Sequence, residues 1–137
     1  MQKSTTVFSV PLAELDEQLR DIASWPAFLP ELQEVEETGR GRYTFTVQRN
    51  ERQQLVNVAV RRSPYGSGMI WTVVDGPAWN GHLYLQVVDA RRTRVHLELN
   101  IEEPPEPDPT GATAAQQGLQ KLHGVVASGD RVLDIPA

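Results

Sequence analysis

Apolar and polar side chains alternate along most of residues 43–101, and this alternation constrains the fold more than any other feature of the sequence. Successive side chains of a strand point to opposite faces, so a period of two indicates strands with one apolar face. Turn-forming residues, such as Asp75-Gly76-Pro77, separate the runs. The pattern therefore predicts a long antiparallel meander with one buried face and one face in water.

The residues predicted to share the apolar face fall into five groups. They are Tyr43, Phe45 and Val47; Val56, Val58 and Val60; Met69, Trp71 and Val73; Leu83, Leu85 and Val87; and Val95, Leu97, Leu99 and Ile101. A buried Trp or Tyr normally needs a partner for its N–H or O–H group. In a pocket that partner can be a ligand or water, so Tyr43 and Trp71 favour a cavity on this face.

Helical periodicity appears on both sides of the meander. Residues 3–10 alternate weakly as a first strand, Pro11 suits the first position of a helix, and apolar residues then recur at helical spacing through residue 22. Pro26 and Pro30 limit the next segment to a short turn of helix. Near the C-terminus, four apolar residues predict a final amphipathic helix: Ala115, Leu119, Leu122 and Val126.

The order of elements predicts one α+β domain over residues 1–137: strand, helix, short helix, about six strands and a long helix. The proline-rich segment EEPPEPDPTG, residues 102–111, is predicted to be a stiff extended crossover to the last helix. A curved sheet with one apolar face must be covered, mainly by that helix. Because a helix is only about 10 Å across, the remaining space is either filled by large side chains or left as a cavity.

Composition excludes several classes of function. The net charge is −5 and no basic run exceeds two residues, which argues against nucleic acid or an anionic membrane as a partner. The absence of cysteine excludes disulfides, thiolate nucleophiles and cysteine-based zinc sites. No segment approaches the roughly 18 apolar residues of a membrane span, and the N-terminus lacks the apolar core of a signal peptide. We therefore expect a cytoplasmic protein, monomeric or weakly dimeric, without a cofactor.

Three stretches resemble a known family: DIASWPAFLPELQEVEE, MIWTVVDGPAWNGHLYLQVV and RTRVHLELNIEEPP. They are similar to the START-like, Bet v 1-like (SRPBCC) superfamily, in particular its polyketide cyclase/dehydrase and coenzyme-Q-binding branch. The resemblance implies a helix-grip fold, in which a curved antiparallel sheet of six to seven strands wraps around a long C-terminal helix, with two short N-terminal helices. It also implies an apolar cavity for a lipid, quinone or polyketide-like molecule.

The predicted cavity joins the apolar sheet face, the final helix and the short proline-flanked segment. Its candidate lining residues are Trp25, Phe28, Leu29, Tyr43, Phe45, Val58, Met69, Trp71, Leu83, Leu85, Leu97, Leu99, Leu119 and Leu122. Trp25, Phe28 and Leu29 have two interpretations. They either lie half-buried at the mouth of the cavity, where a ligand covers them, or plug the end of the core.

Residues suited to chemistry are few. His82 and His96 are predicted on the solvated sheet face, with His82 opposite Glu98 or Asn100, and no third ligand completes a metal site there. Tyr43 and His123 are weak candidates for a catalytic acid or base facing the cavity. Arg61 or Arg62 is a further candidate for pairing with a ligand oxygen, although a charged strand end is the commoner role.

These observations leave three hypotheses open. The leading one is a non-catalytic protein that binds a small, mostly apolar molecule, with polar contacts from Tyr43, Trp71, Asn57 and His123. The second is a polyketide cyclase/dehydrase-type enzyme that uses the same cavity. The third is an interaction protein that docks on a partner through an exposed patch at residues 25–29.

Overall fold

The computed structural model describes residues 1–49, 51–102, 107 and 109–134, with side chains as far as Val126. Its main element is an antiparallel sheet of seven strands in the order β1-β7-β6-β5-β4-β3-β2. The strands are β1 (Gln2–Phe8), β2 (Leu32–Gly39), β3 (Arg42–Arg49), β4 (Arg52–Arg62), β5 (Gly68–Asp75), β6 (Trp79–Asp89) and β7 (Arg92–Ile101). The meander from β2 to β7 confirms the predicted alternation.

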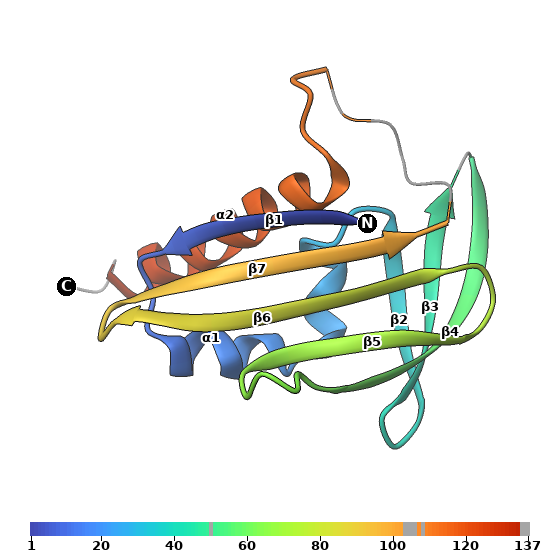
Figure 1. Cartoon of the computed structure of the whole chain (residues 1–137), viewed down its shortest axis with the longest axis horizontal. Helices are drawn as coiled ribbons and strands as arrows, with labels where there is room; N and C mark the ends of the chain where they lie inside the picture. Colours follow the sequence, from blue (N-terminus) through green and yellow to red (C-terminus); the bar gives the residue numbers. More distant parts are fainter. Residues whose placement is uncertain (50, 103–106, 108, 135–137) are drawn as a thin grey trace.

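The sheet is strongly curved, because β2 and β3 run almost perpendicular to β1, β6 and β7 (Figure 1). One cause is a register shift between Asn57 and Val58 in the pairing of β4 with β5. An extra residue in one strand bends the sheet and increases its twist. The curvature creates a concave face, and the apolar side chains of the meander line it.

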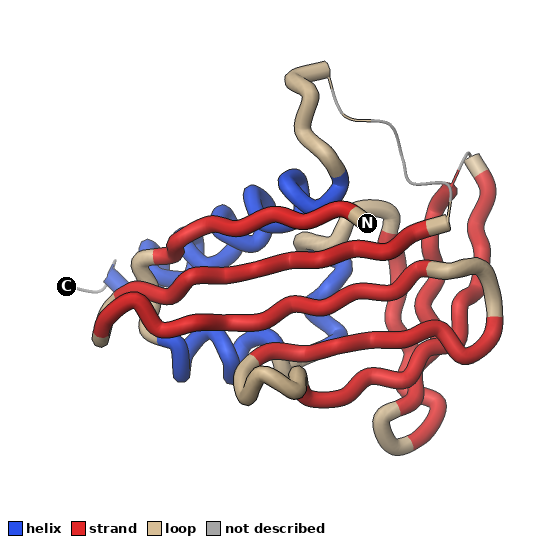
Figure 2. The backbone as a smooth tube through the Cα atoms, viewed as in Figure 1, coloured by secondary structure: helices blue, strands red, loops and turns tan. Residues whose placement is uncertain are grey.

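Three helices cover the concave face and lie together on one side of the sheet (Figure 2). Helix α1 (Leu12–Leu19) lies against β5 and β6, the 3₁₀ helix η1 (Ile22–Ala27) against β2, and α2 (Ala114–Asp134) against β1 and β7. This arrangement is the helix-grip α+β fold. The long C-terminal helix therefore shares the concave face with the two N-terminal ones. The crossover predicted at residues 102–111 lies largely outside the described residues.

The apolar run of residues 12–22 does not form the single helix that its spacing predicts. Helix α1 ends at Leu19, and η1 begins at Ile22 after Asp21, whose backbone leaves the helical region at φ −81° and ψ 86°. Pro26 lies inside η1, where its missing N–H prevents regular α-helical bonding. The break turns the chain so that both short helices bury an apolar side against the sheet.

Helix α2 approaches the sheet closely because its first turns carry small residues. Ala114 and Ala115 are fully buried, and a Cβ atom added at Gly118 would lie 2.9 Å from the Leu97 Cδ2 atom of β7. Leu119 and Leu122 then continue the buried stripe. The small residues let the helix backbone lie against β1 and β7, so no wide space remains under its N-terminal half.

A buried carboxylate fastens α1 to the hairpin between β4 and β5. Asp16 accepts two hydrogen bonds of 3.0 Å from the Arg62 guanidinium, one of 3.0 Å from the Gly68 N–H and one of 3.1 Å from Arg20. Burial acts to raise the pKa of Asp16, but the bonds from Arg62, Gly68 and Arg20 together lower it. The expected role of Arg62 as a ligand contact is thus replaced by a structural one.

Replacing Asp16 with Asn should destabilise the fold by about 2–3 kcal/mol at neutral pH, because bonds between a carboxylate and charged donors are lost. Chemical denaturation of the wild type and the variant measures this difference. Glu17→Gln, at an exposed position of the same helix, is the matched control and should change stability little.

The effect should depend on pH in one direction. The folded-state pKa of Asp16 lies below its ordinary value of 3.8, so its contribution is fully present above about pH 4 and is lost as pH falls through the lowered pKa. The stability difference between wild type and Asp16→Asn should therefore shrink as pH falls from about 7 to about 3. A difference that stays constant over this range would show that the ionised carboxylate is not what fastens the helix.

Candidate functional site

A cluster of aromatic rings fills the centre of the concave face. The ring centroids of Trp25 and Trp71 are 5.0 Å apart, and Trp79 lies 6.3 Å from Trp71. Phe45 contacts both outer tryptophans edge-on, at 6.1 Å from Trp25 and 5.9 Å from Trp79. We call these four residues, each at most 2% exposed, the aromatic cluster. It joins η1 with strands β3, β5 and β6.

The cluster depends on a glycine in β6. Gly81 is paired directly with Trp71, and a Cβ atom added there would lie 2.0 Å from the indole ring. Any larger residue would occupy the same space as the indole. Gly81 therefore lets the Trp71 ring lie flat beneath β6, between Trp25 and Trp79.

The three indole N–H groups of the cluster differ in their hydrogen bonding. Trp25 donates to the Leu19 carbonyl and Trp71 donates to the Trp79 carbonyl, each at 3.0 Å. The Trp79 N–H, which is also buried, has no well-formed hydrogen bond to a described residue. Two of the indoles are thus tied to the backbone, and the third presents a free donor inside the protein.

Two charged side chains lie beside Trp79 at one end of the cluster. Arg49, on the inner face of β3, is 8% exposed, and its Nε atom lies 3.5 Å from the Oε2 atom of Glu31. The other carboxylate oxygen, Oε1, is buried without a hydrogen bond to a described residue. We call Glu31, Arg49 and the Trp79 N–H the polar end of the concave face.

Burial dominates the electrostatics of Glu31 and raises its pKa, while Arg49 and the nearby Trp79 indole act in the opposite direction. The backbone of Glu31 is in the left-handed region at φ 71°, and its carbonyl accepts the Gln48 N–H of β3 at 2.8 Å. A non-glycine residue in this region is strained and persists where its surroundings hold it. The turn from η1 into β2 therefore holds the carboxylate facing inward.

The residues predicted to line a cavity lie together on the concave side. All are buried except Tyr43, which is half-buried and donates a 3.1 Å hydrogen bond from its hydroxyl group to Glu37. Burial and the Glu37 carboxylate raise the pKa of the Tyr43 phenol. His123 is exposed on α2, with its ring edge-on to Phe8 at 5.0 Å. Asn57 is exposed and bonds to Thr44 and Asp75.

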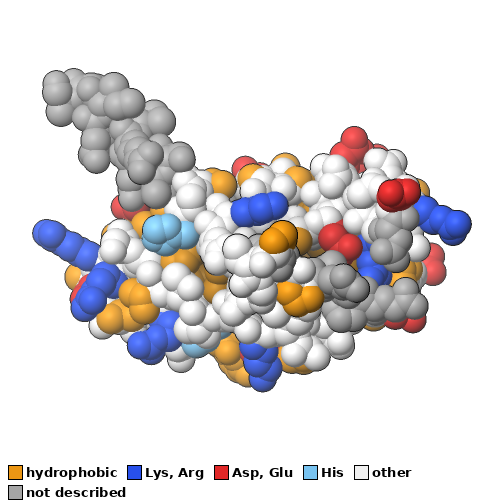
Figure 3. Space-filling view, turned by 90° about the horizontal axis from the view of Figure 1, so that it is seen from above, with side chains coloured by type: hydrophobic (Ala, Val, Ile, Leu, Met, Phe, Trp, Pro, Cys, Tyr) orange, Lys and Arg blue, Asp and Glu red, His pale blue; other side chains and the backbone are white. Residues whose placement is uncertain are grey.

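The interpretation of residues 25–29 as an exposed docking patch is wrong. Trp25, Phe28 and Leu29 are at most 3% exposed, since the break between α1 and η1 turns them onto the sheet. They fit the alternative in which they plug the end of the core. On the face shown in Figure 3, hydrophobic side chains occur in small groups between polar ones. Such scattered exposure is normal for a folded domain.

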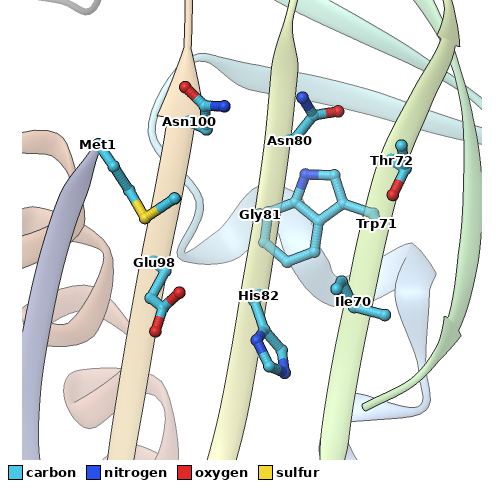
Figure 4. Close-up of a pocket in the computed structure, with 9 residues that line it drawn as sticks. All are labelled: Met1, Ile70, Trp71, Thr72, Asn80, Gly81, His82, Glu98 and Asn100. Carbon is cyan, nitrogen blue, oxygen red and sulfur yellow. The ribbon is translucent and has the colours of Figure 1, made fainter. Parts of the chain in front are cut away.

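The convex face of the sheet carries a separate, polar hollow of about 260 Å³ (Figure 4). Its rim includes the side chains of Asn80 and His82 on β6 and of Glu98 and Asn100 on β7. The pairing of His82 with Glu98 confirms the register expected from the sequence.

Neighbouring rings stack beside the convex hollow. His82 lies 4.6 Å from Tyr84, which stacks on His96 at 4.5 Å. Burial lowers the pKa of both histidines. In the described part of the chain, no three side chains of the metal-binding types come together, as the sequence suggested for this face.

The sequence interpretation missed the polar end and Trp79. Arg49 continues the inward parity of Phe45 and Val47, and this signal could have revealed a buried arginine at the end of β3. Glu31 gives no such signal, because its direction depends on the strained turn after Pro30. Its proximity to Trp79, 48 positions further along the chain, follows from the curvature of the sheet.

Comparison with solved structures places the fold in a known class. The chain superimposes on a protein from Deinococcus radiodurans with a TM-score of 0.69 and 19% identity, covering 88% of this chain and 89% of the other. A START superfamily protein from Mycobacterium smegmatis gives 0.67 and 14%, covering 96% and 97%. The Zhui aromatase/cyclase from Streptomyces sp. R1128 gives 0.60 and 17%, covering 94% and 85%. At these identities the likeness establishes a START-like helix-grip fold.

The family follows from the sequence. A family model described as polyketide cyclase / dehydrase and lipid transport matches residues 1–126, and the chain belongs to this family. No curated protein matches the sequence. None of the helices among the described residues is both long and apolar enough to cross a membrane.

Replacing Gly81 with Ala should destabilise the protein by about 1–3 kcal/mol, because the new methyl group overlaps the Trp71 indole. Thermal denaturation followed by tryptophan fluorescence measures the loss and reports the displaced ring. Gly124→Ala is the matched control. Nothing lies within 4 Å of a Cβ atom at that helical position, so the control should be neutral or stabilise by about 0.5–1 kcal/mol. A Gly81→Ala protein as stable as wild type would contradict the described packing.

Proposed function

We propose that the protein binds a small, mostly apolar molecule between the curved sheet and its three helices, without converting it chemically. The observation that carries the proposal is the aromatic cluster, which gives the concave face a broad apolar surface ending in one polar group of side chains. Ligand sites commonly combine an apolar lining with a few placed polar groups. Membership of a family described by lipid transport as well as cyclase chemistry supports the same reading.

Binding would draw its free energy mainly from apolar burial. At about 25 cal/mol per Å², a ligand that buries about 200 Å² of apolar surface gains about 5 kcal/mol before the costs of association are subtracted. Flat rings would gain further by stacking on the aromatic cluster. We therefore expect moderate affinity for a bicyclic molecule and higher affinity for a longer one.

The ligand would reach the cluster by displacing the plug. Phe28 and Leu29 follow η1, which lies on β2, and Leu29 is joined to η1 by a hydrogen bond from its N–H to the Trp25 carbonyl at 2.9 Å. Outward movement of this short segment would expose the cluster while β1, β7 and α2 remain together. The small residues at the start of α2 favour this route, since they hold that helix close to the sheet.

The cyclase/dehydrase alternative is less supported by the geometry. A general acid or base must lie within hydrogen-bond reach of the reacting atom. Tyr43 is the half-buried candidate at the margin of the cluster, 6.4 Å from the Phe45 ring, but its hydroxyl group is engaged by Glu37. His123 is exposed beside Phe8. The arrangement offers a binding surface and few groups placed to transfer protons.

Native mass spectrometry of the protein purified from its own host should reveal a co-purified apolar molecule that leaves on denaturation. Tyr43→Phe and His123→Ala should retain the same molecule, since neither group is needed for binding or conversion in this proposal. Tyr65→Phe, at an exposed position in the loop after β4, is the matched control.

Two outcomes would oppose the proposal. A bare chain, even after incubation with an extract of host lipids, would contradict binding. A chemically different molecule retained by Tyr43→Phe or His123→Ala would instead support catalysis, because the variant would hold an unconverted substrate.

A further inference from the structure

The polar end of the concave face contains a buried donor and a buried acceptor that do not satisfy each other. The Trp79 side chain is 2% exposed, and its N–H has no well-formed hydrogen bond to a described residue. The Oε1 atom of Glu31 is also buried without one. Native proteins pair nearly all such groups with protein atoms or water, so two unpaired groups in one place indicate that something else belongs there.

The fold does not leave indoles unpaired in general. Trp25 and Trp71, the two other members of the cluster with an indole, each donate to a backbone carbonyl at 3.0 Å. Trp79 is buried to the same degree and differs in facing Glu31 and Arg49, where no backbone carbonyl receives its proton. A buried group without a partner is costly, and a strained turn at Glu31 adds to that cost. Such features accumulate where a ligand is held.

We infer that the polar end recognises a hydroxyl group on an otherwise apolar ligand, with the hydroxyl oxygen accepting the Trp79 N–H and its hydrogen donated to Oε1 of Glu31. The inference rests on the proposed function and specifies the ligand class for the same site. An alcohol or phenol fits because one hydroxyl group both accepts and donates a hydrogen bond.

Other polar groups fit the polar end less well. A ketone or ether oxygen can only accept, so it would leave the Glu31 oxygen unpaired. A ligand carboxylate would face the Glu31 carboxylate, and a ligand ammonium group would face the Arg49 guanidinium; like charges in a buried site repel strongly. The Glu31–Arg49 pair therefore selects for a neutral group that can donate as well as accept.

The test compares 2-naphthol with its methyl ether, 2-methoxynaphthalene, by isothermal titration calorimetry on the intact chain. Both probes present the same bicyclic ring to the aromatic cluster, but the ether cannot donate. Wild type should bind 2-naphthol about tenfold more tightly, the scale of one good hydrogen bond. In Trp79→Phe and Glu31→Gln the preference should fall to about twofold or less.

Two control variants separate the polar end from general packing. Trp71→Phe removes an equally buried indole whose N–H is already bonded, so it should alter the affinity for both probes alike. Glu34→Gln changes an exposed carboxylate on β2 and should leave the preference unchanged. Circular dichroism confirms that each variant is folded, and Trp79→Phe keeps the test decisive if Glu31→Gln, which leaves Arg49 without its carboxylate, fails to fold.

The outcomes distinguish the two levels of the argument. Loss of the preference in Trp79→Phe, with retention in Trp71→Phe and Glu34→Gln, supports the inference. Equal binding of both probes by wild type would overturn it while leaving the proposed function intact, since water then fills the polar end. Binding of neither probe would overturn the proposed function for this ligand class, and the inference with it.

Discussion

The contact between the Trp71 indole and Gly81 lies at the centre of the structure. It requires a residue without a Cβ atom in the middle of β6, and it fixes the indole between Trp25 from η1 and Trp79 from the start of β6. Phe45 joins the same rings from β3. Because these rings come from four elements, the contact relates the curvature of the sheet to the position of the helix layer. The identity of the whole concave surface follows from it.

Much of this arrangement could be predicted from the sequence. The period of two assigned inner and outer faces correctly for β3 to β7, including the pairing of His82 with Glu98, because strand parity is a local property. The helix break after Leu19 was missed, since apolar spacing continues across it although the backbone at Asp21 leaves the helix. Asp16 was also missed. Its partners Arg62 and Gly68 lie about 50 positions away, and only the folded chain brings them together.

The two faces of the sheet offer different environments. The convex hollow is rimmed by amides, an imidazole and a carboxylate in contact with water, a composition common on solvated sheets. The concave side is apolar except for Glu31, Arg49 and the Trp79 N–H, where burial makes every unpaired atom count. The difference explains why the candidate ligand site lies under the helices. It also explains why sequence patterns located the apolar lining but missed the polar end, which depends on one strained turn.

The account's central claim is that the aromatic cluster receives the ligand, and NMR of the three indole N–H groups tests it directly. In a titration of ¹⁵N-labelled protein with 2-naphthol, the indole signal of Trp79 should shift most, because its proton gains an acceptor. The signals of Trp25 and Trp71, already bonded to backbone carbonyls, should shift less. Unchanged indole signals, together with shifts of the Asn80 and Asn100 side-chain amides, would place the ligand on the convex face and contradict the account.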